Sequence, residues 1–401
     1  MALASDDNAK EGVARIIRAI DQMTAINEGD RWDAVVIGAG PAGAIAARQL
    51  ALQRKRVLLI DKAELPREKV CGGCLGGAAL ALLNDIGLGN ISTACQGIPL
   101  RMFELSSGGV VARIPIGNRI AVSRRTFDDA LVREATRAGV VVRDRTDGTL
   151  QPVTDDSCRT VALRHTGEEV CVLADVVVVA TGLANVPPEC VAQVAPGSLI
   201  GLGALSDDAP LNVVPGTLHM AYGSAGYVGV TAVDQGRFDI AAAIDPHALA
   251  AAESPGRLVQ EILQASGSML TADWENLQWH GTPRLTRRTT PIASHRCLLI
   301  GDAAAYIEPF TGEGIGWAMQ SGVLAASLLA GSLQPWDGTI ESRWKQLFDT
   351  AISDRHRFCR RLSRCVRVNA FRQLAIRGLR RAPWLSRPVV RILDRPLGFT
   401  C

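Results

Sequence analysis

The hydrophobic pattern at the start of the chain changes its period several times, and each change predicts a structural element. In EGVARIIRAIDQM, apolar residues between Val13 and Ile20 recur at helical spacing, which predicts a short amphipathic helix before the first domain. The next stretch, WDAVVIGAGPAGAIAARQLALQRKRVLLIDKAE, contains an apolar run, a glycine-rich turn, an alanine-rich helix and a second apolar run that ends at Asp61. This order predicts a βαβ unit and a parallel sheet.

The pattern farther along the chain predicts a second sheet of a different kind. Residues 100–122 alternate and predict strands with a hairpin at 106–109, whereas RTFDDALVREATRAG has the period of a helix. GVVVRD and LADVVVVATG are typical of buried strands that extend the first sheet. From residue 185 to about residue 281, glycines, prolines and alternating stretches predict an antiparallel sheet. HRCLLIGDAAA returns to strand and helix, and the part after Trp336 is mostly helical.

Length and composition narrow the class of protein. A chain of 401 residues can bury a large core, and its size suggests two or three lobes. It contains no run of roughly 18 uncharged apolar residues, so we expect no membrane-spanning helix. The ten cysteines are scattered and nothing at the N-terminus resembles a secretion signal, so we expect reduced thiols and a cytoplasmic protein.

The first motif with chemical meaning is GAGPAG, in which three glycines have G-x-G-x-x-G spacing. Gly38 permits the tight turn, Gly40 lets the backbone approach a pyrophosphate, and Gly43 lets the helix pack closely. Asp61 follows about twenty residues later, where a carboxylate can accept a hydrogen bond from a ribose hydroxyl. Strand, helix and acid in this order predict dinucleotide binding rather than a purely structural turn.

The second motif is LLIGDAAAYIEPFTGEGIGWAMQSG. A strand ends at Gly301 and Asp302, and the turn PFTGEGIG opens another helix. A carboxylate at a strand end can hold sugar hydroxyls, and the amides of residues 311–315 can face an electron-rich ring edge. The alternative is a simple capped helix start. Glu313 is a candidate proton-transfer group, although glutamates at helix starts commonly act as caps.

GAGPAG with the distal GDAA and PFTGEGI resembles the FAD-dependent oxidoreductases of the p-hydroxybenzoate hydroxylase fold. The resemblance implies that the first motif holds the ADP half of FAD and that Asp302 holds ribityl or pyrophosphate groups. VSRRTFDDAL has the pattern R-x-x-F-D, which implies that Arg124 contacts the flavin. Within this superfamily, KVCGGCLGGAALALL with PFTGEGI looks most like the geranylgeranyl reductase branch, over roughly residues 32–332. The implied cofactor-binding residues are Gly38, Gly40, Pro41, Ala42, Gly43, Asp61, Lys62, Arg124, Gly301, Asp302, Pro309, Gly312, Gly314 and Ile315.

The chain departs from related patterns at two places. Hydroxylases of this fold often carry an Asp-Gly pair where this chain has Thr181 and Gly182. The FAD and NAD(P)H contacts attributed to that pair are therefore in doubt for this chain. The W-x-W-x-I-P signature of flavin halogenases is absent, and no lysine occurs between Lys69 and Lys345 to match their active-site lysine. Halogenation is therefore disfavoured.

We predict an α/β (α+β) fold with a Rossmann-like FAD-binding domain, a β-sheet substrate domain and C-terminal helices. The expected ranges are 1–31 for an N-terminal helical extension, 32–185 with 282–332 for a discontinuous FAD-binding domain, 186–281 for the substrate domain, and 333–401 for a basic helical region.

The segment KVCGGCLGG contains Cys71 and Cys74 in C-x-x-C spacing. A zinc site would need two more ligands, and the six histidines form no cluster, so we predict no metal site. Three interpretations remain: a loop lining the flavin pocket, inert buried cysteines, or a redox dithiol. The resemblance aligns Cys71 with the family's C-G-G cysteine and makes it a candidate catalytic residue, whereas Cys74 looks like an addition.

No nucleophile, base and acid triad is evident, which fits chemistry carried by a cofactor. No second G-x-G-x-x-G follows a later strand, so NAD(P)H would bind transiently or an electron-donor protein would reduce the flavin. We expect an FAD-dependent oxidoreductase that acts on a hydrophobic small molecule, with alkene reduction favoured by the C-G-G loop. The alternatives are a monooxygenase that uses NAD(P)H and O2, and a flavin-binding protein without turnover.

The C-terminal region is strongly basic. The segment 355–395 contains many arginines and a single acid, Asp394, and mixes them with apolar residues such as Phe371 and Trp384. This pattern is typical of a helix that lies on an anionic membrane surface. A helical cap with a solvated arginine face explains the pattern almost as well. We predict no nucleic-acid binding because no recognised fold supports it.

Overall fold

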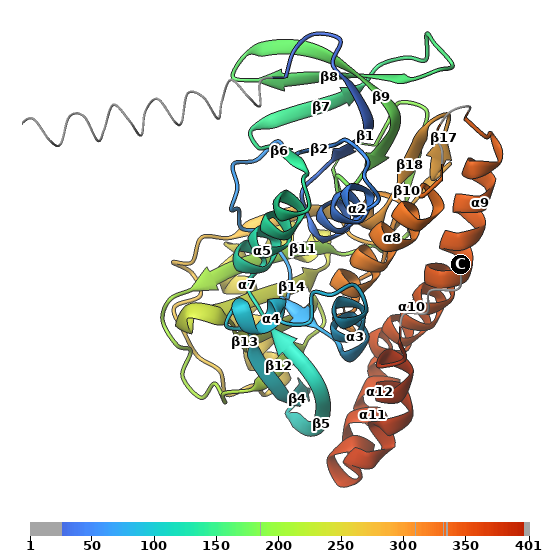
Figure 1. Ribbon diagram of the computed structural model, residues 1–401. Helices are drawn as coiled ribbons and strands as arrows, with labels where there is room; N and C mark the ends of the chain where they lie inside the picture. Colours follow the sequence, from blue (N-terminus) through green and yellow to red (C-terminus); the bar gives the residue numbers. More distant parts are fainter. Residues whose placement is uncertain (1–25, 185, 309, 332, 334–335, 397–401) are drawn as a thin grey trace, which may run out of the picture.

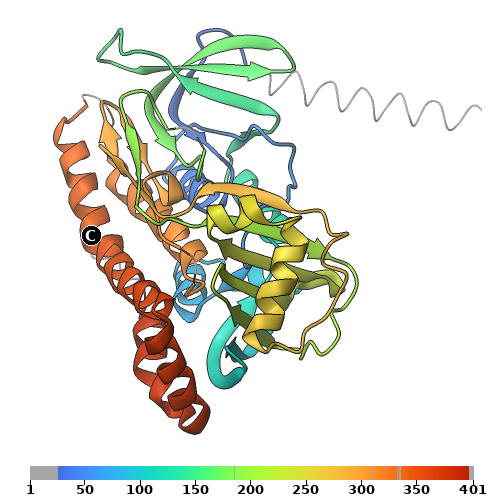
Figure 2. The same cartoon turned by 180° about the vertical axis from the view of Figure 1, so that it is seen from behind.

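The computed structural model describes residues 26–184, 186–308, 310–331, 333 and 336–396, and Figures 1 and 2 show it from opposite sides. The helix predicted around Val13–Ile20 and the candidate Pro309 lie outside these residues. Two large sheets occupy opposite ends of the molecule, helices lie between them, and the C-terminal helices form an arm along one side (Figure 1). The predicted α/β (α+β) class is confirmed.

The first sheet is built on the predicted βαβ unit. Its main path has the order β17-β18-β9-β1-β2-β6, and β9 also pairs with β8, which pairs with β7. The pairs from β18 to β6 are parallel, and Val35 of β1 lies beside Leu58 on one side and Val177 on the other. Strands buried on both faces explain the continuous apolar runs of the sequence. The strands are β1 (Arg31–Ile37), β2 (Val57–Ile60), β6 (Val141–Arg143), β7 (Thr146–Leu150), β8 (Arg159–His165), β9 (Glu168–Val179), β17 (Ala293–Ser294) and β18 (Cys297–Leu299).

Helices α2 (Pro41–Leu52), α5 (Arg124–Arg137) and α8 (Gly314–Leu328) pack beside this sheet. Helix α2 contacts α8 through small residues: a Cβ on Gly322 would lie only 2.4 Å from the carbonyl oxygen of Ala42, so this position requires glycine. Ser123 caps α5 by accepting a hydrogen bond from the amide of Thr126. The short helices α3 (Gly77–Asp85) and α4 (Ile91–Ala94) complete this layer.

The second sheet has the order β15-β11-β14-β13-β12-β4-β5-β3. It is antiparallel except where β12 runs parallel to β4, with His219 beside Glu104. Its strands are β3 (Cys74–Leu75), β4 (Ile98–Ser107), β5 (Val110–Ala121), β11 (Ile200–Ser206), β12 (Thr217–Tyr222), β13 (Gly226–Ala232), β14 (Phe238–Ile244) and β15 (His280–Arg284).

The membership of this sheet corrects the predicted domain ranges. Strands β3, β4 and β5 lie within the range 32–185 that we assigned to the FAD-binding domain, yet they belong to the second sheet. The range 186–281 therefore contains only part of that sheet, and β15 extends to Arg284. The alternating pattern predicted the β4–β5 hairpin but could not predict its partner, because Glu104 pairs with a residue 115 positions later.

The two faces of the second sheet have different neighbours. Helix α7 (Pro255–Ser266), preceded by α6 (Pro246–Ala251), covers one face of the sheet (Figure 2). On this face Ile240 and Ala242 pack with Ile262. Side chains alternate along a strand, so Asp239 and Ala241 point to the opposite face. That face looks toward the first domain and holds the candidate site.

The C-terminal helices pack on both halves of the molecule. Near the first sheet, the indole of Trp344 donates a hydrogen bond to the carbonyl oxygen of Leu299 (3.1 Å), and near the second sheet Arg372 donates to Ser107 (3.0 Å). The helical segments are α9 (Thr339–Phe348), the π-helix η3 (Asp349–Ser353), α10 (Asp354–Arg367), α11 (Asn369–Arg381), η4 (Pro383–Ser386) and α12 (Arg387–Leu393). Among the described residues, no helix combines the length and the apolar character needed to span a membrane.

A small third sheet and two 3-10 turns complete the fold. The sheet pairs β10 (Val191–Val194), β16 (Arg287–Thr290) and β19 (Ala305–Tyr306). The turns are η1 (Asp234–Gly236), before β14, and η2 (Gly301–Ala303), directly after β18. Turn η2 brings Asp302 to the carboxyl end of the first sheet.

Candidate functional site

The glycine turn between β1 and α2 has no room for side chains at two of its three glycines. A Cβ on Gly38, whose φ is 106°, would lie 2.4 Å from the carbonyl oxygen of Ala180, and a Cβ on Gly43 would lie 1.9 Å from that of Gly38. Gly40 differs because its Cβ would meet only the guanidinium groups of Arg124 and Arg67, each at 3.8 Å. The turn therefore opens at Gly40 toward two cations.

Asp61 lies at the end of β2, as predicted, and holds the glycine turn. Its carboxylate accepts hydrogen bonds from the amides of Ala39 (2.9 Å) and Ala63 (3.0 Å) and pairs with Arg67 (3.1 Å). Burial alone would raise the pKa of Asp61, but Arg67 and the two amides outweigh it and lower the pKa, so the carboxylate stays charged. The neighbouring candidate Lys62 is exposed.

A network of charges extends from Asp61 to the start of α5. The buried Arg124 forms a bidentate pair with Asp128, with distances of 2.8 and 2.7 Å, and Arg67 reaches the same carboxylate at 3.4 Å. Lys69 lies among these groups, and burial, followed by the charge of Arg124, lowers its pKa. Arg67, Lys69 and Arg124 thus gather positive charge opposite the first turn of α2.

Asp302 faces this network from the other side. Burial raises the pKa of its carboxyl, and the charges of Lys69, Arg124 and Arg287 partly offset that effect. The nitrogen of Lys69 also lies close to Gly182, because a Cβ there would sit 3.0 Å from it. Gly182, which follows Thr181, therefore lies beside the charge network.

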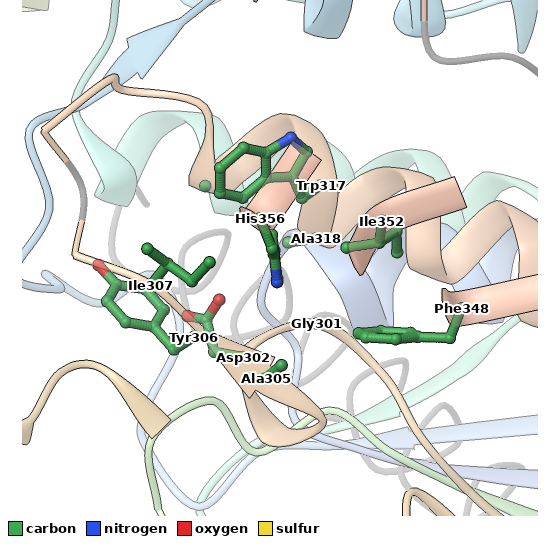
Figure 3. A pocket seen from close by; sticks show the side chains of 11 residues that line it. Gly301, Asp302, Ala305, Tyr306, Ile307, Trp317, Ala318, Phe348, Ile352 and His356 are labelled. Atoms are coloured by element: carbon green, nitrogen blue, oxygen red, sulfur yellow. The ribbon is translucent and has the colours of Figure 1, made fainter. Parts of the chain in front are cut away.

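The start of α8 and the C-terminal helices share a small cavity next to Asp302. Figure 3 shows the carboxylate of Asp302 beside Tyr306, with the rings of Trp317 and His356 across from them. The Trp317 and His356 rings lie 4.6 Å apart in an edge-on arrangement. Burial, aided by nearby arginines, lowers the pKa of His356 to about 3, so this ring is neutral. Among the candidates, Gly301, Asp302 and Gly314 line this cavity.

The cysteine loop lies between the two domains. Val70 packs on the second sheet at Gly203, where a Cβ would lie 2.9 Å from its side chain, and Gly72 approaches Ala241. Gly73, with φ of 55°, accepts a hydrogen bond from the amide of Val122 (2.9 Å). Glycines let the loop fit between the sheet and the charge network.

The two cysteines of this loop differ in environment. Cys71 is partly exposed and lies close to Arg124 of the charge network. Cys74 is buried in β3, and burial, followed by the proximity of Cys71, raises its pKa to about 12. Cys74 is therefore a neutral thiol, and it packs against Gly312 of the second glycine turn. No group of metal ligands occurs among the described residues.

Glu313 occupies the N-cap position of α8 and is only 3% exposed. Its carboxylate pairs with Arg119 of β5 at 3.0 Å, and Arg119 also pairs with Asp394 at 3.0 Å. Burial raises the pKa of Glu313, and Arg119 partly offsets the effect. These contacts tie the start of α8 to the second sheet and to the end of the C-terminal arm.

Asp239 is a site residue that the sequence analysis missed. It lies on the inner face of β14 beside the cysteine loop, because a Cβ on Gly73 would be 3.5 Å from its carboxylate. Among the residues that the structure describes, none donates a hydrogen bond to that carboxylate, and burial, followed by the charge of Glu68, raises its pKa to about 8. The sequence feature that could have indicated Asp239 is its position as the single acid in the otherwise apolar strand FDIAAAI.

Aromatic side chains form an apolar wall on the same inner face. Tyr222 and Tyr227 stack with their ring centres 5.5 Å apart, and Phe310 meets Tyr227 edge-on at 5.5 Å. This cluster also contains Met220 and Ala243 of the sheet and side chains of α10 and α11. The buried Arg372 of α11 lies 4.4 Å above the ring of Tyr222.

The residues at this edge fit FAD. The open position at Gly40 and the first turn of α2 provide backbone amides, while Arg67, Lys69 and Arg124 provide the positive charge that a pyrophosphate requires. Asp302 provides an acceptor for hydroxyl groups at the strand end. The sequence motifs indicated Asp302 and Arg124, and Asp128 is the acid of the same R-x-x-F-D pattern as Arg124, but Arg67 and Lys69 carry no motif that would have indicated them.

A comparison with protein families matches residues 31–365 to the model described as FAD binding domain. The menaquinone reductase of Mycobacterium tuberculosis is 29% identical over 365 residues, covering 80% of this chain and 83% of the relative. Digeranylgeranylglycerophospholipid reductase 2 of Methanococcoides burtonii is 26% identical over 331 residues, covering 78% of each.

Among solved structures, the flavin-dependent brominase Bmp2 superposes with a TM-score of 0.74 at 20% identity and covers 91% of this chain and 93% of its own. At this identity the likeness concerns the fold alone. The relatives of higher identity are both named as reductases.

Proposed function

Because the chain belongs to the FAD binding domain family and is an FAD-dependent oxidoreductase, we propose that it reduces a carbon–carbon double bond of a long hydrophobic substrate. We propose a polyprenyl lipid as the substrate class. The relatives are named as reductases of menaquinone and of digeranylgeranylglycerophospholipid, and about four fifths of each chain align. The apolar wall beside the cofactor residues is the observation that carries this choice.

The apolar wall suits a hydrocarbon chain. Tyr222, Tyr227 and Phe310 pack on one another and on side chains of α10 and α11, so this side of the site is lined by apolar rings. Small residues lie beside them in the register, namely Gly203, Gly229 and Ala241, and the cysteine loop packs on this row through Val70 and Gly72. We propose that a long, thin hydrocarbon chain suits this apolar lining better than a bulky polar substrate does.

The proposed reaction adds two hydrogen atoms across one double bond of the substrate. One π bond of the substrate breaks, and two C–H bonds form from a hydride and a proton. When bound, reduced FAD supplies the hydride and is oxidised. NAD(P)H, bound transiently, or an electron-donor protein returns the electrons. The chain's own residues hold the cofactor, exclude water and supply the proton.

Three cations and one open turn would hold the cofactor. Arg67 and Arg124 flank the position above Gly40 and are themselves fixed by Asp61 and Asp128. Fixed guanidinium groups lose little freedom when an anion binds, so the site is preorganised for a pyrophosphate.

Asp239 is the proposed proton donor. A carboxyl with a pKa of about 8 is mostly protonated at pH 7, whereas an ordinary carboxylate is not. It lies beside the cysteine loop on the same inner face of the sheet as Ala241 and Tyr227, with Tyr227 paired to Ala243, four residues along β14 from Asp239. Cys71 is the second candidate, since its thiol faces Arg124 at the same border.

The test is anaerobic reoxidation of the flavin. The holoenzyme is photoreduced and mixed with a phospholipid that carries geranylgeranyl chains, which has no quinone ring to accept electrons, and flavin absorbance is followed. We expect the unsaturated lipid to reoxidise the flavin and its fully saturated analogue to leave it reduced. Reoxidation only after O2 is admitted, with a hydroxylated product, would replace the proposal with a monooxygenase. No reaction with the unsaturated lipid or with O2 would favour a flavoprotein without turnover.

A further inference from the structure

The outer side of helix α11 and turn η4 exposes an unusual set of large apolar residues. Leu374 is 72% exposed and Trp384 is 60% exposed. Val368, Phe371 and Leu385 are also exposed, so these five define what we call the arm patch. Turn η4 packs back on α11, because a Cβ on Gly378 would lie 4.0 Å from Leu385. Leu385 of the arm patch therefore lies against α11.

Helix α11 has two opposed faces. Arg372 and Ile376, four positions apart, are buried against the second sheet and the apolar wall. Phe371 and Leu374, together with Arg377, lie at spacings of three and point away from that core. Packing within the chain explains the first face but not the second.

Positive charge surrounds the arm patch. Arg377, Arg380, Arg381, Arg387 and Arg391 are all exposed, and none of them forms an ion pair with a residue that the structure describes. The one acid of this region, Asp394, is already paired with Arg119. The arm patch is thus apolar at its centre and cationic around it.

The location of the arm patch leaves it accessible. In both views the arm projects beyond the rest of the molecule at the end where α11 lies (Figures 1 and 2). The side of α11 opposite the arm patch carries Arg372, which stacks on Tyr222 of the apolar wall. Only the width of one helix, about 10 Å, separates the exposed surface from that wall.

We propose that the arm patch and its arginines dock the protein on the surface of a bilayer that carries anionic headgroups. Arginines attract the phosphates, and exposed Leu, Phe and Trp side chains enter the interface between headgroups and acyl chains. A nucleic acid would satisfy the arginines but would leave Leu374 and Val368 in water. The proposal goes beyond the proposed reaction and does not depend on it.

The chain offers a matched control. Leu211 is 68% exposed and Met269 is 74% exposed, and they lie near each other because Asn212 donates a hydrogen bond to the carbonyl oxygen of Met269. These two residues are as apolar and as exposed as Leu374 and Trp384, but no comparable group of arginines surrounds them in the sequence.

The experiment is co-sedimentation of the full-length holoenzyme with vesicles, without substrate. Vesicles of equal parts phosphatidylglycerol and phosphatidylcholine are compared with pure phosphatidylcholine at low and high salt. We expect binding to the anionic vesicles only, with release at high salt because charges are screened. Leu374→Asp with Trp384→Asp should weaken partitioning at least tenfold, whereas Leu211→Asp with Met269→Asp should not change it.

FAD content and melting temperature, measured on both double variants, show that each remains folded. Equal binding by both variants, or no binding of the intact protein at low salt, would overturn the proposal. Self-association that the Leu374→Asp and Trp384→Asp changes abolish, in the absence of vesicle binding, would assign the arm patch to a second copy of the chain and would also overturn it.

Discussion

Replacing Gly40 with valine separates cofactor binding from folding. A Cβ at Gly40 would lie 3.8 Å from the guanidinium groups of Arg67 and Arg124, which is ordinary contact distance. The backbone at Gly40 has φ of −77° and ψ of −177°, an extended conformation that valine adopts readily. The turn can therefore accept the side chain as long as no ligand is present.

The cost to folding is small. Gly40 is the N-cap of α2, and valine is a poorer N-cap than glycine by about 1 kcal/mol. For a chain of this size, that corresponds to a fall of the melting temperature on the order of 1 °C. The cost to FAD binding is large, because the valine methyl groups fill the space through which a pyrophosphate reaches the amides. We expect affinity at least a hundredfold weaker, which is about 2.7 kcal/mol.

The assay measures FAD released per chain after denaturation, together with the melting temperature of the protein without FAD. Gly338→Val is the matched control, since Gly338 is the N-cap of α9 and a Cβ there meets no atom within 4 Å. Gly338→Val should retain FAD as the unmodified protein does. Full FAD occupancy in Gly40→Val would show that the glycine turn does not bind the pyrophosphate of FAD. A Gly40→Val protein that is unfolded without FAD would show that the turn has no room for the valine side chain.

Substitutions at five other residues test separate parts of the site. Because the pKa of Asp239 is raised to about 8, the rate at which substrate reoxidises the flavin should fall roughly tenfold between pH 7 and pH 9. The Asp239→Asn variant should retain FAD but react slowly at every pH. A rate that does not change with pH in the unmodified enzyme would exclude Asp239 as the proton donor. The raised pKa also means that the free energy of unfolding decreases as pH rises from about 4 to about 8, a slope that Asp239→Asn should reduce. Cys71→Ala should lower turnover with FAD retained and Cys74→Ala should matter less, whereas equal losses in both would indicate packing roles. Arg119→Met leaves the buried Glu313 unpaired and should lower the free energy of unfolding, measured by chemical denaturation, by about 3–5 kcal/mol. Adding Glu313→Gln to this variant should restore part of the lost stability. An unchanged denaturation midpoint in Arg119→Met would contradict the assigned role of the ion pair.

Local features of the fold could be predicted from the sequence because their causes are local. The G-x-G-x-x-G turn has one geometry, and the structure shows why: side chains at Gly38 and Gly43 would collide with backbone oxygens. The continuous apolar runs likewise indicated parallel strands buried on both faces. Asp61 and Asp302 follow such strands, so their positions at the sheet edge were predictable too.

Features that depend on distant partners could not be predicted. The pattern of β4 is the same whichever sheet it joins, and its pairing with β12 placed the hairpin in the second sheet. Asp239 lies in strand β14, and the sequence does not say which face of that strand points toward the first domain. The contact between Ala241 and Gly72 in the fold identifies that face. Lys69 carries no motif, and only the fold brings it beside Asp302. The binding residues at strand ends were thus accessible from sequence, and those assembled between domains were not.

The central claim is that reduced FAD in this protein reduces a double bond of a prenyl lipid. The most direct test is a single anaerobic turnover of the photoreduced holoenzyme with the geranylgeranyl phospholipid, followed by mass spectrometry of the extracted lipid. The account predicts a product that has gained two hydrogens for each flavin oxidised, with no oxygen incorporated. A lipid recovered unchanged while the flavin reoxidises, or a product that contains oxygen and forms only in air, would contradict it.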